Sequence, residues 1–228
     1  MEVSVPGSAM PVPLPPLARR ESTAEAVAAV LRTQIAGGAI RPGTQLREEH
    51  IASALEVSRN TVREAFRLLS HERLVEHALH RGVFVRVSGP QEVRDIYRTR
   101  RFVEPLGMRA VVEQAAGLRE LADAVAAGGA AADAGDWDAV GTADIDFHRG
   151  LVAACGSVHL EAMFEGVLAE LRLAFLRLPD AQALHQPFLL RNEGMVVLLE
   201  AGDLHTALRE LDDYLHEAEA QLLAVIDA

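Results

Sequence analysis

Between residues 57 and 69 the sequence places basic and apolar side chains at helical spacing, just after a serine that can begin a helix. Ser58 is a favourable N-cap because its hydroxyl can accept a hydrogen bond from the first turn. At about 100° per residue, an apolar arc then lies beside a polar one. The polar arc consists of Arg59, Asn60, Arg63, Arg67 and Ser70. Guanidinium groups bind phosphate and guanine in bidentate geometry, so the stretch predicts a DNA-contacting helix.

A second pattern that could do chemistry lies in the later half of the chain. Asp144 and His148 are four residues apart, which makes their side chains neighbours on one helix. A carboxylate and an imidazole can bind a divalent metal, or they can form a buried hydrogen-bonded pair. Arg100 and Glu104 have the same spacing and could form a surface ion pair. No nucleophile or oxyanion-hole pattern accompanies these residues, which argues against a metal-dependent enzyme.

The elements that must position the arginine helix can be predicted from local signals. Ser22 and Glu25 have capping-box spacing and begin a helix that ends at Gly37 and Gly38. A short apolar helix around residues 51–55, followed by Glu56 and Val57, has the spacing of a helix-turn-helix. Residues 74–76 and 83–87 favour β-strands around an exposed tip at residues 80–82. Three helices and a small hairpin predict a winged helix.

Beyond Ser88-Gly89-Pro90, which marks a boundary, every segment has helical periodicity. We therefore predict a mainly α protein with a C-terminal antiparallel all-α bundle and ligand space between its helices. The predicted helices cover about residues 92–114, 118–127, 136–154, 158–176, 188–201 and 204–226. The predicted domains are a disordered Pro-rich tail (1–20), a winged-helix DNA-binding domain (21–88) and an all-helical effector-binding and dimerisation domain (89–228).

Charge separates along the chain in the same way. The 228 residues carry 22 basic and 33 acidic side chains, and every basic one is arginine. Residues 17–88 hold eleven Arg and eight acidic residues, a net charge of +3, whereas residues 89–228 hold eleven Arg and 24 acidic residues, a net charge of −13. This asymmetry favours contact with phosphate through the first half alone.

Cysteine usage and hydropathy indicate the compartment. Cys155 is the single cysteine, so no internal disulfide can form, and we interpret it as a buried, inert thiol. The first residues lack the pattern of a signal peptide, and no apolar run reaches the roughly 18 residues of a membrane helix. We expect a cytoplasmic protein with no membrane partner.

Short motifs in both halves resemble one family of bacterial regulators. The first half resembles the DNA-binding domain of GntR-type repressors, and the second resembles the FCD effector domain of the FadR subfamily. The first set of motifs is Pro42-Gly43, Leu46, Glu48, Ala52, Val57-Ser58-Arg59, Val62-Arg63-Glu64-Ala65, Leu68, Leu74-Val75 and Arg81-Gly82. The second set is Tyr97, Arg100, Glu104-Pro105, Gly135-Asp136-Trp137, Asp144, Asp146-Phe147-His148 and Gly202-Asp203.

The resemblance implies which residues contact DNA. Operator contacts would come from the start of the helix, and the tip of the wing would lie near the minor groove. The residues implied are Ser58, Arg59, Asn60, Thr61, Arg63, Arg67, Arg81 and Gly82. The chain departs from the family twice: Glu49 stands where a DNA-contacting arginine is common, and Glu56 replaces the usual turn glycine.

The resemblance also implies an effector site in the second half. It places Arg100, with Glu104, at a cavity where the guanidinium could clamp a carboxylate. In many FCD proteins the pair equivalent to Asp144 and His148 binds a divalent metal such as Zn, Mn or Ni, together with two more histidines. Here those two positions correspond to Asn192 and Tyr214, which are poorer ligands. The site is therefore either a metal centre on Asp144 and His148, with Asn192 as a further ligand, or a metal-free effector pocket.

These implications lead to one functional hypothesis. We expect a transcription regulator, a metabolite-responsive repressor, that binds a palindromic operator in double-stranded DNA as a homodimer. A small effector, expected to be an organic acid, would alter operator affinity. Two other classes remain as alternatives, a small metal-dependent enzyme and a protein-binding helical scaffold.

Overall fold

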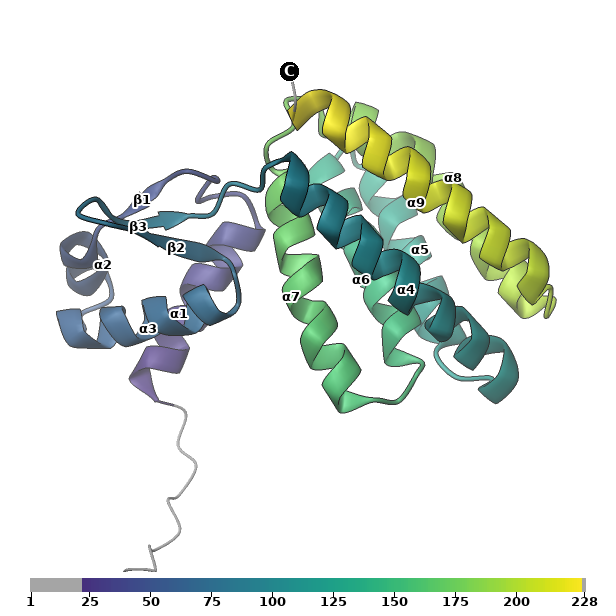
Figure 1. Ribbon diagram of the computed structural model, residues 1–228, viewed down its shortest axis with the longest axis horizontal. Helices are drawn as coiled ribbons and strands as arrows, with labels where there is room; N and C mark the ends of the chain where they lie inside the picture. The colour runs from purple at the N-terminus through teal and green to yellow at the C-terminus, as the bar shows by residue number, and fades with distance from the viewer. Residues whose placement is uncertain (1–21, 227–228) are drawn as a thin grey trace, which may run out of the picture.

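A computed structural model describes residues 22–226, so the predicted Pro-rich tail lies outside the described residues. The N-terminal part forms a compact group of helices with a small sheet along one side (Figure 1). Its elements are α1 (Thr23–Ala36), β1 (Gln45–Leu46), α2 (Glu48–Ala54), α3 (Arg59–His71), β2 (Val75–Ala78) and β3 (Gly82–Val85). This is the predicted winged helix.

Both predicted helix starts are confirmed by their caps. Ser22 and Glu25 form the full capping box of α1, with the Ser22 amide donating to Glu25 Oε2 at 2.6 Å. The Ser58 hydroxyl accepts from the Thr61 amide at 3.1 Å at the start of α3. In the turn between α2 and α3, Glu56 has a φ of 54°. The chain therefore holds a glutamate in the left-handed conformation that the usual glycine adopts without strain.

The wing is a three-stranded antiparallel sheet with strand order β1-β3-β2. The hairpin is in the predicted place, with Val75 opposite Val85 and Ala78 opposite Gly82. The two-residue strand β1 was not predicted. It pairs Leu46 with Val83, and so small an element has no alternating pattern of its own to reveal it.

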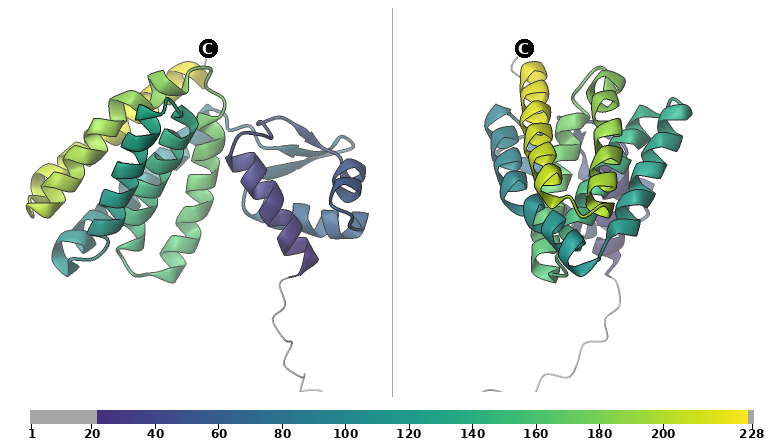
Figure 2. Two further views of the ribbon diagram at one scale, coloured as in Figure 1. Left: turned by 180° about the vertical axis from the view of Figure 1, so that it is seen from behind. Right: turned by 90° about the vertical axis from the view of Figure 1, so that its right-hand side faces the viewer.

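The C-terminal part is the predicted antiparallel bundle, which the views in Figure 2 show from two further sides. Its helices are α4 (Pro90–Gln114), α5 (Leu118–Asp133), α6 (Trp137–Ala153), α7 (Val158–Phe175), α8 (Ala181–Glu200) and α9 (Leu204–Ile226). Two predicted boundaries were wrong. Helix α5 continues through Gly128 and Gly129, and α8 begins well before Pro187, because packing outweighs the weak helix propensity of these residues.

Two apolar cores hold the chain together, one in each part. The core of the winged helix includes Phe66 and Leu69 of α3, and it also receives Leu173 from α7 of the bundle. Among the bundle helices, α7 lies directly against the winged helix, with α1 beside it (Figures 1 and 2). None of the helices within residues 22–226 is long and apolar enough to span a membrane.

Candidate functional site

The recognition helix α3 is amphipathic as its sequence predicts. Its apolar arc is fully buried, and it consists of Val62, Ala65, Phe66 and Leu69. Its polar arc faces outward, with the side chains of Arg59 and Arg63 60% and 59% exposed. The arginines are therefore presented to a partner instead of being packed into the core, as a helix that enters the major groove requires.

Each arginine of this surface is paired with a carboxylate. Arg63 Nε donates to both oxygens of Glu48 on α2, at 3.0 and 2.9 Å. Arg59 Nη2 lies 2.5 Å from Glu49 Oε1. Arg67 Nη1 donates to an oxygen of Glu64, which is on α3 itself, at 2.6 Å. These carboxylates hold the guanidinium groups in place and reduce the positive charge that the free protein offers to DNA.

The wing tip is held by a residue that the sequence patterns did not single out. Gln45 Nε2 donates to the Arg81 carbonyl oxygen at 2.7 Å, and a Cβ at Gly82 would lie 3.2 Å from that nitrogen. Gly82 has a φ of 102°, which favours glycine. The Arg81 guanidinium lies over the Phe84 ring at 5.6 Å. Arg81 thus lies at an exposed wing tip whose backbone is held by the hydrogen bond from Gln45.

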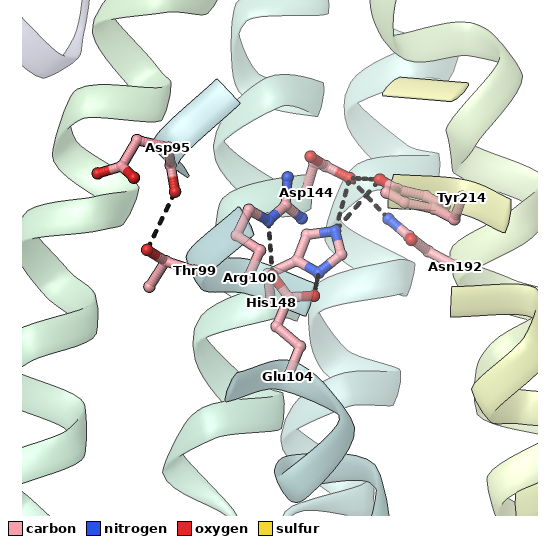
Figure 3. A network of polar contacts seen from close by, with 8 residues as sticks. All are labelled: Asp95, Thr99, Arg100, Glu104, Asp144, His148, Asn192 and Tyr214. Atoms are coloured by element: carbon pink, nitrogen blue, oxygen red, sulfur yellow. Dashed lines mark hydrogen bonds and ion pairs between the residues drawn. The ribbon is translucent and has the colours of Figure 1, made fainter. Parts of the chain in front are cut away.

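The six residues predicted for the effector site meet inside the bundle, although they come from four helices (Figure 3). On α4, Arg100 Nε donates to Glu104 Oε1 at 2.6 Å. The other oxygen of Glu104 lies 2.8 Å from His148 Nδ1 on α6. Asp144 Oδ1 accepts from Tyr214 Oη of α9 at 2.7 Å and from Asn192 Nδ2 of α8 at 2.8 Å. The contact between Glu104 and His148 was not predicted.

Electrostatics keep both carboxylates of this network ionised. Burial raises the pKa of the Glu104 carboxyl, but the charge of Arg100 and the interactions with His148 outweigh burial and hold that pKa below its ordinary value. Burial likewise raises the pKa of Asp144, and His148, His185 and the Tyr214 hydroxyl more than offset it, so this pKa is also lowered. Burial and the charge of Asp144 raise the pKa of Tyr214 well above its usual range. The tyrosine is therefore a neutral hydrogen-bond donor.

Two buried polar atoms in this network have no hydrogen-bond partner within the described part of the chain. They are Arg100 Nη2, a donor, and Asn192 Oδ1, an acceptor. Unsatisfied buried groups of this kind are rare in native proteins, and each calls for a partner such as a water molecule, an ion or a ligand. A cavity of about 10 Å³ lies beside Asp144, Asn192 and His185. His185 lies two turns before Asn192 on α8, a spacing that could have revealed it, but the sequence patterns did not single it out.

The donor set does not fit a transition metal. Asn192 directs its amide hydrogens, not its oxygen, at Asp144, and Tyr214 donates to the same carboxylate. Both ring nitrogens of His148 are engaged, Nδ1 with Glu104 and Nε2 with Tyr214 Oη at 3.2 Å. Across residues 22–226, no three His, Cys, Asp or Glu side chains are grouped as a metal ion would require. Asn192 of α8 and Tyr214 of α9 therefore both occupy Oδ1 of Asp144 as hydrogen-bond donors.

An exposed arginine helix on a winged helix, joined to a helical bundle with a buried polar site, defines a one-component DNA-binding transcription regulator. Residues 23–85 match the model of bacterial regulatory proteins of the gntR family, and residues 95–217 match that of the FCD domain. The chain belongs to the GntR family and has an FCD effector-binding domain.

Individual relatives agree with this assignment. The chain is similar to a probable D-xylose utilization operon transcriptional repressor of Paenarthrobacter nicotinovorans, with 30% identity over 81% of each chain. It is also similar to a crystal structure from Rhodococcus sp. RHA1, described as a GntR transcriptional regulator, with 42% identity and a TM-score of 0.85 over 88% of this chain and 97% of that one. McbR/YncC of E. coli shares the fold, with 21% identity and a TM-score of 0.74 over 88% of this chain and 97% of that one.

Proposed function

We propose that this regulator is a homodimeric repressor of a metabolite operon and that a small carboxylate-bearing effector, bound without a metal, changes its operator affinity. The observation that carries the proposal is Nη2 of Arg100, which has no hydrogen-bond partner in the described part of the chain and belongs to a residue only 1% exposed. A buried guanidinium nitrogen is a strong donor for a carboxylate. Asn192 Oδ1 adds an acceptor in the same network that has no partner among residues 22–226. We propose no catalytic role for these residues.

The proposal treats Asp144 and His148 as parts of a hydrogen-bonded effector pocket. Tyr214 and Asn192 donate to Asp144, which supports direct recognition of an organic effector over recognition through a bound ion. The cavity beside Asp144 is large enough for about one water molecule. Arg100 does not line this cavity, so an organic acid would have to separate the helices around the cavity to reach the guanidinium, and this movement is the basis for regulation.

For DNA, we propose that Arg59, Asn60, Thr61 and Arg63 contact base edges or phosphates of each half-site, with Arg67 beside them and the wing residues Arg81 and Gly82 near the minor groove. Two-fold symmetry of a homodimer would match a palindromic operator. Phe102 and Leu106, one turn apart on α4, are 74% and 51% exposed and support dimerisation through this helix. Analytical sedimentation of the Phe102→Glu variant tests whether the dimer forms through this surface. A variant that remains dimeric would contradict dimerisation through α4.

The effector is tested by thermal shift with a panel of small organic acids, because a ligand selective for the folded state raises the melting temperature. We expect at least one acid to stabilise the protein and to change its affinity for a selected operator duplex. Arg100→Gln and Asn192→Ala should each abolish the shift. Arg101→Gln is the control, since its side chain pairs with Glu219 of α9 and not with the residues of the proposed site. If no acid acts, or if both site variants respond normally, the proposed site is wrong.

A further inference from the structure

Helix α7 holds the recognition helix and the wing through one buried carboxylate. Glu170 is buried, and its two oxygens accept from Arg73 Nη1 and Arg86 Nη1, each at 3.1 Å. Arg73 lies two residues beyond the end of α3, and Arg86 directly follows β3. A rotation of α7 about its axis would therefore pull on the C-terminal end of the recognition helix and on the wing together.

The same turn of α7 also holds α1. Arg172 is buried, and its Nε donates to the carbonyl oxygen of Ala36, the last residue of α1, at 2.8 Å. A cation at the carboxyl end of a helix is favourable because the last carbonyl groups have no partner within the helix. Leu173 inserts into the winged-helix core. Residues 170–173, which we call the α7 turn, thus contact three separate parts of the DNA-binding domain.

Beside this turn the two domains are separated by a cleft that Glu170, Arg172 and Leu173 help to line. Its volume is about 1050 Å³, and its walls come from α1 and the end of α3 on one side and from α4, α6 and α7 on the other. Outside the turn, Arg41 Nη1 donates to the Leu176 carbonyl oxygen at 3.1 Å, and Arg177 donates to the Ser88 carbonyl oxygen. The orientation of the winged helix therefore depends on contacts made by α7 and by the residues that directly follow it.

Arg172 also reaches toward the proposed effector pocket. A Cβ at Gly141 of α6 would lie 2.9 Å from Arg172 Nη1 and 2.4 Å from His185 Nε2, so both side chains pack directly against this glycine. His185 in turn lines the small cavity with Asp144 and Asn192. Its ring packs edge-on against Phe175 of α7, with 4.9 Å between ring centroids. His185 therefore stands between the pocket and α7.

We propose that His185 and Arg172 are positioning residues that connect the effector pocket to the recognition helix through the α7 turn. This inference rests on the proposed function of the pocket. Ligand entry separates α6 from α8, and His185 then moves away from Gly141. Arg172 moves in turn, which changes its hydrogen bond to the Ala36 carbonyl oxygen. The α7 turn then reorients the winged helix and changes operator affinity without any change at the DNA-contacting side chains. Coupling of this kind is expected to alter affinity by about tenfold.

The first experiment uses the full-length chain, without effector, on an operator duplex selected from a random pool and on a duplex of random sequence. Arg172→Gln should weaken selected-operator binding by about tenfold, while binding to the random duplex stays within about twofold, because the phosphate-contacting arginines are intact. Arg119→Gln, an exposed arginine on α5, is the matched control and should change neither affinity. If Arg172→Gln fails to fold, Arg172→Lys, which keeps the charge, should show a smaller loss.

The second experiment places a wedge between His185 and Arg172. Gly141→Ala adds a methyl group that must displace one of them, although Gly141 is on α6 and does not belong to the DNA-binding domain. Gly150→Ala is the control on the same helix, where a Cβ would meet Leu121 Cδ2 at 2.9 Å. We expect Gly141→Ala to weaken operator binding, Gly150→Ala to leave it unchanged, and the double variant Gly141→Ala/Arg172→Gln to match Arg172→Gln alone.

Two results would overturn the connection. One is that the effects of Gly141→Ala and Arg172→Gln multiply, because independent sites behave in that way. The other is that Gly150→Ala weakens operator binding as much as Gly141→Ala, because the effect would then reflect a general loss of stability. Neither measurement includes an effector. Failure of the proposed function would instead appear as a lack of response to every acid in the thermal-shift panel.

Discussion

Arg63 of the recognition helix donates through Nε to both oxygens of Glu48, at 3.0 and 2.9 Å, on the helix that precedes it. The residue that we propose reads a base is thus already engaged by a carboxylate in the free protein. Binding DNA requires Arg63 either to leave Glu48 or to use its remaining donors. An arginine presents five N–H donors in a fixed fork, so the terminal nitrogens remain for a guanine or phosphate.

We predict that Arg63→Ala weakens binding to the selected operator by about tenfold or more, because a base-reading bidentate contact is lost. Binding to a duplex of random sequence should fall much less. Fluorescence anisotropy at fixed salt measures both affinities. Arg98→Ala, an exposed arginine on α4 paired with Asp95, is the control. Unchanged operator affinity in Arg63→Ala would remove this residue from the DNA-binding surface.

We predict that Glu48→Gln, in contrast to Arg63→Ala, strengthens binding to random-sequence DNA. Loss of the carboxylate frees the Arg63 guanidinium and removes a negative charge that repels phosphate, so affinity should rise by about threefold and depend more steeply on salt. Glu113→Gln, at the exposed end of α4, should leave binding unchanged. A Glu48→Gln variant with the wild-type salt dependence would show that the pair does not limit contact with phosphate.

We predict that Tyr214→Phe lowers the free energy of unfolding by about 1–3 kcal/mol, because Asp144 loses one of its two buried donors. Tyr97→Phe is the matched control. Tyr97 is equally buried, and its ring lies 4.9 Å from the Arg100 guanidinium carbon, but it is not one of the two donors to Asp144. Denaturant unfolding of both variants checks the comparison, and equal losses would contradict it.

We predict that acid destabilises the effector domain through Asp144 and Glu104. The pKa of each carboxyl is lower in the folded protein than its ordinary value, so each contributes stability that is present above the ordinary pKa and is lost as pH falls through the folded value. The free energy of unfolding should therefore decline below about pH 4. The Asp144→Asn variant should be less stable than the native protein at neutral pH, and its free energy of unfolding should fall less on acidification. Parallel curves for the two proteins would refute the assignment.

We predict that the native chain takes up no stoichiometric zinc, whereas Asn192→His/Tyr214→His does. The double variant would join two imidazoles to Asp144 and His148, which gives a nitrogen and oxygen set suited to zinc. Elemental analysis after dialysis against zinc measures uptake. Glu193→His, next to Asn192 but exposed, is the control. Stoichiometric zinc in the native chain would contradict the metal-free pocket.

The sequence by itself determined the local features of this protein. Helix caps at Ser22 and Ser58, the buried and exposed arcs of α3 and the hairpin all follow from interactions between residues close along the chain, and all were found as predicted. The conformation of Glu56 is of the same kind, because a turn of fixed length between two helices demands positive φ whatever the residue.

Only the tertiary structure decided how distant residues meet. Spacing placed Asp144 beside His148, but periodicity cannot show that Glu104 lies 2.8 Å from His148, or that Arg172, on a later helix, holds the end of α1. The buried role of His185 was missed for the same reason. Contacts between helices depend on how each helix is rotated and shifted against its neighbours, and this is set by the packing of the whole core, which no local pattern records.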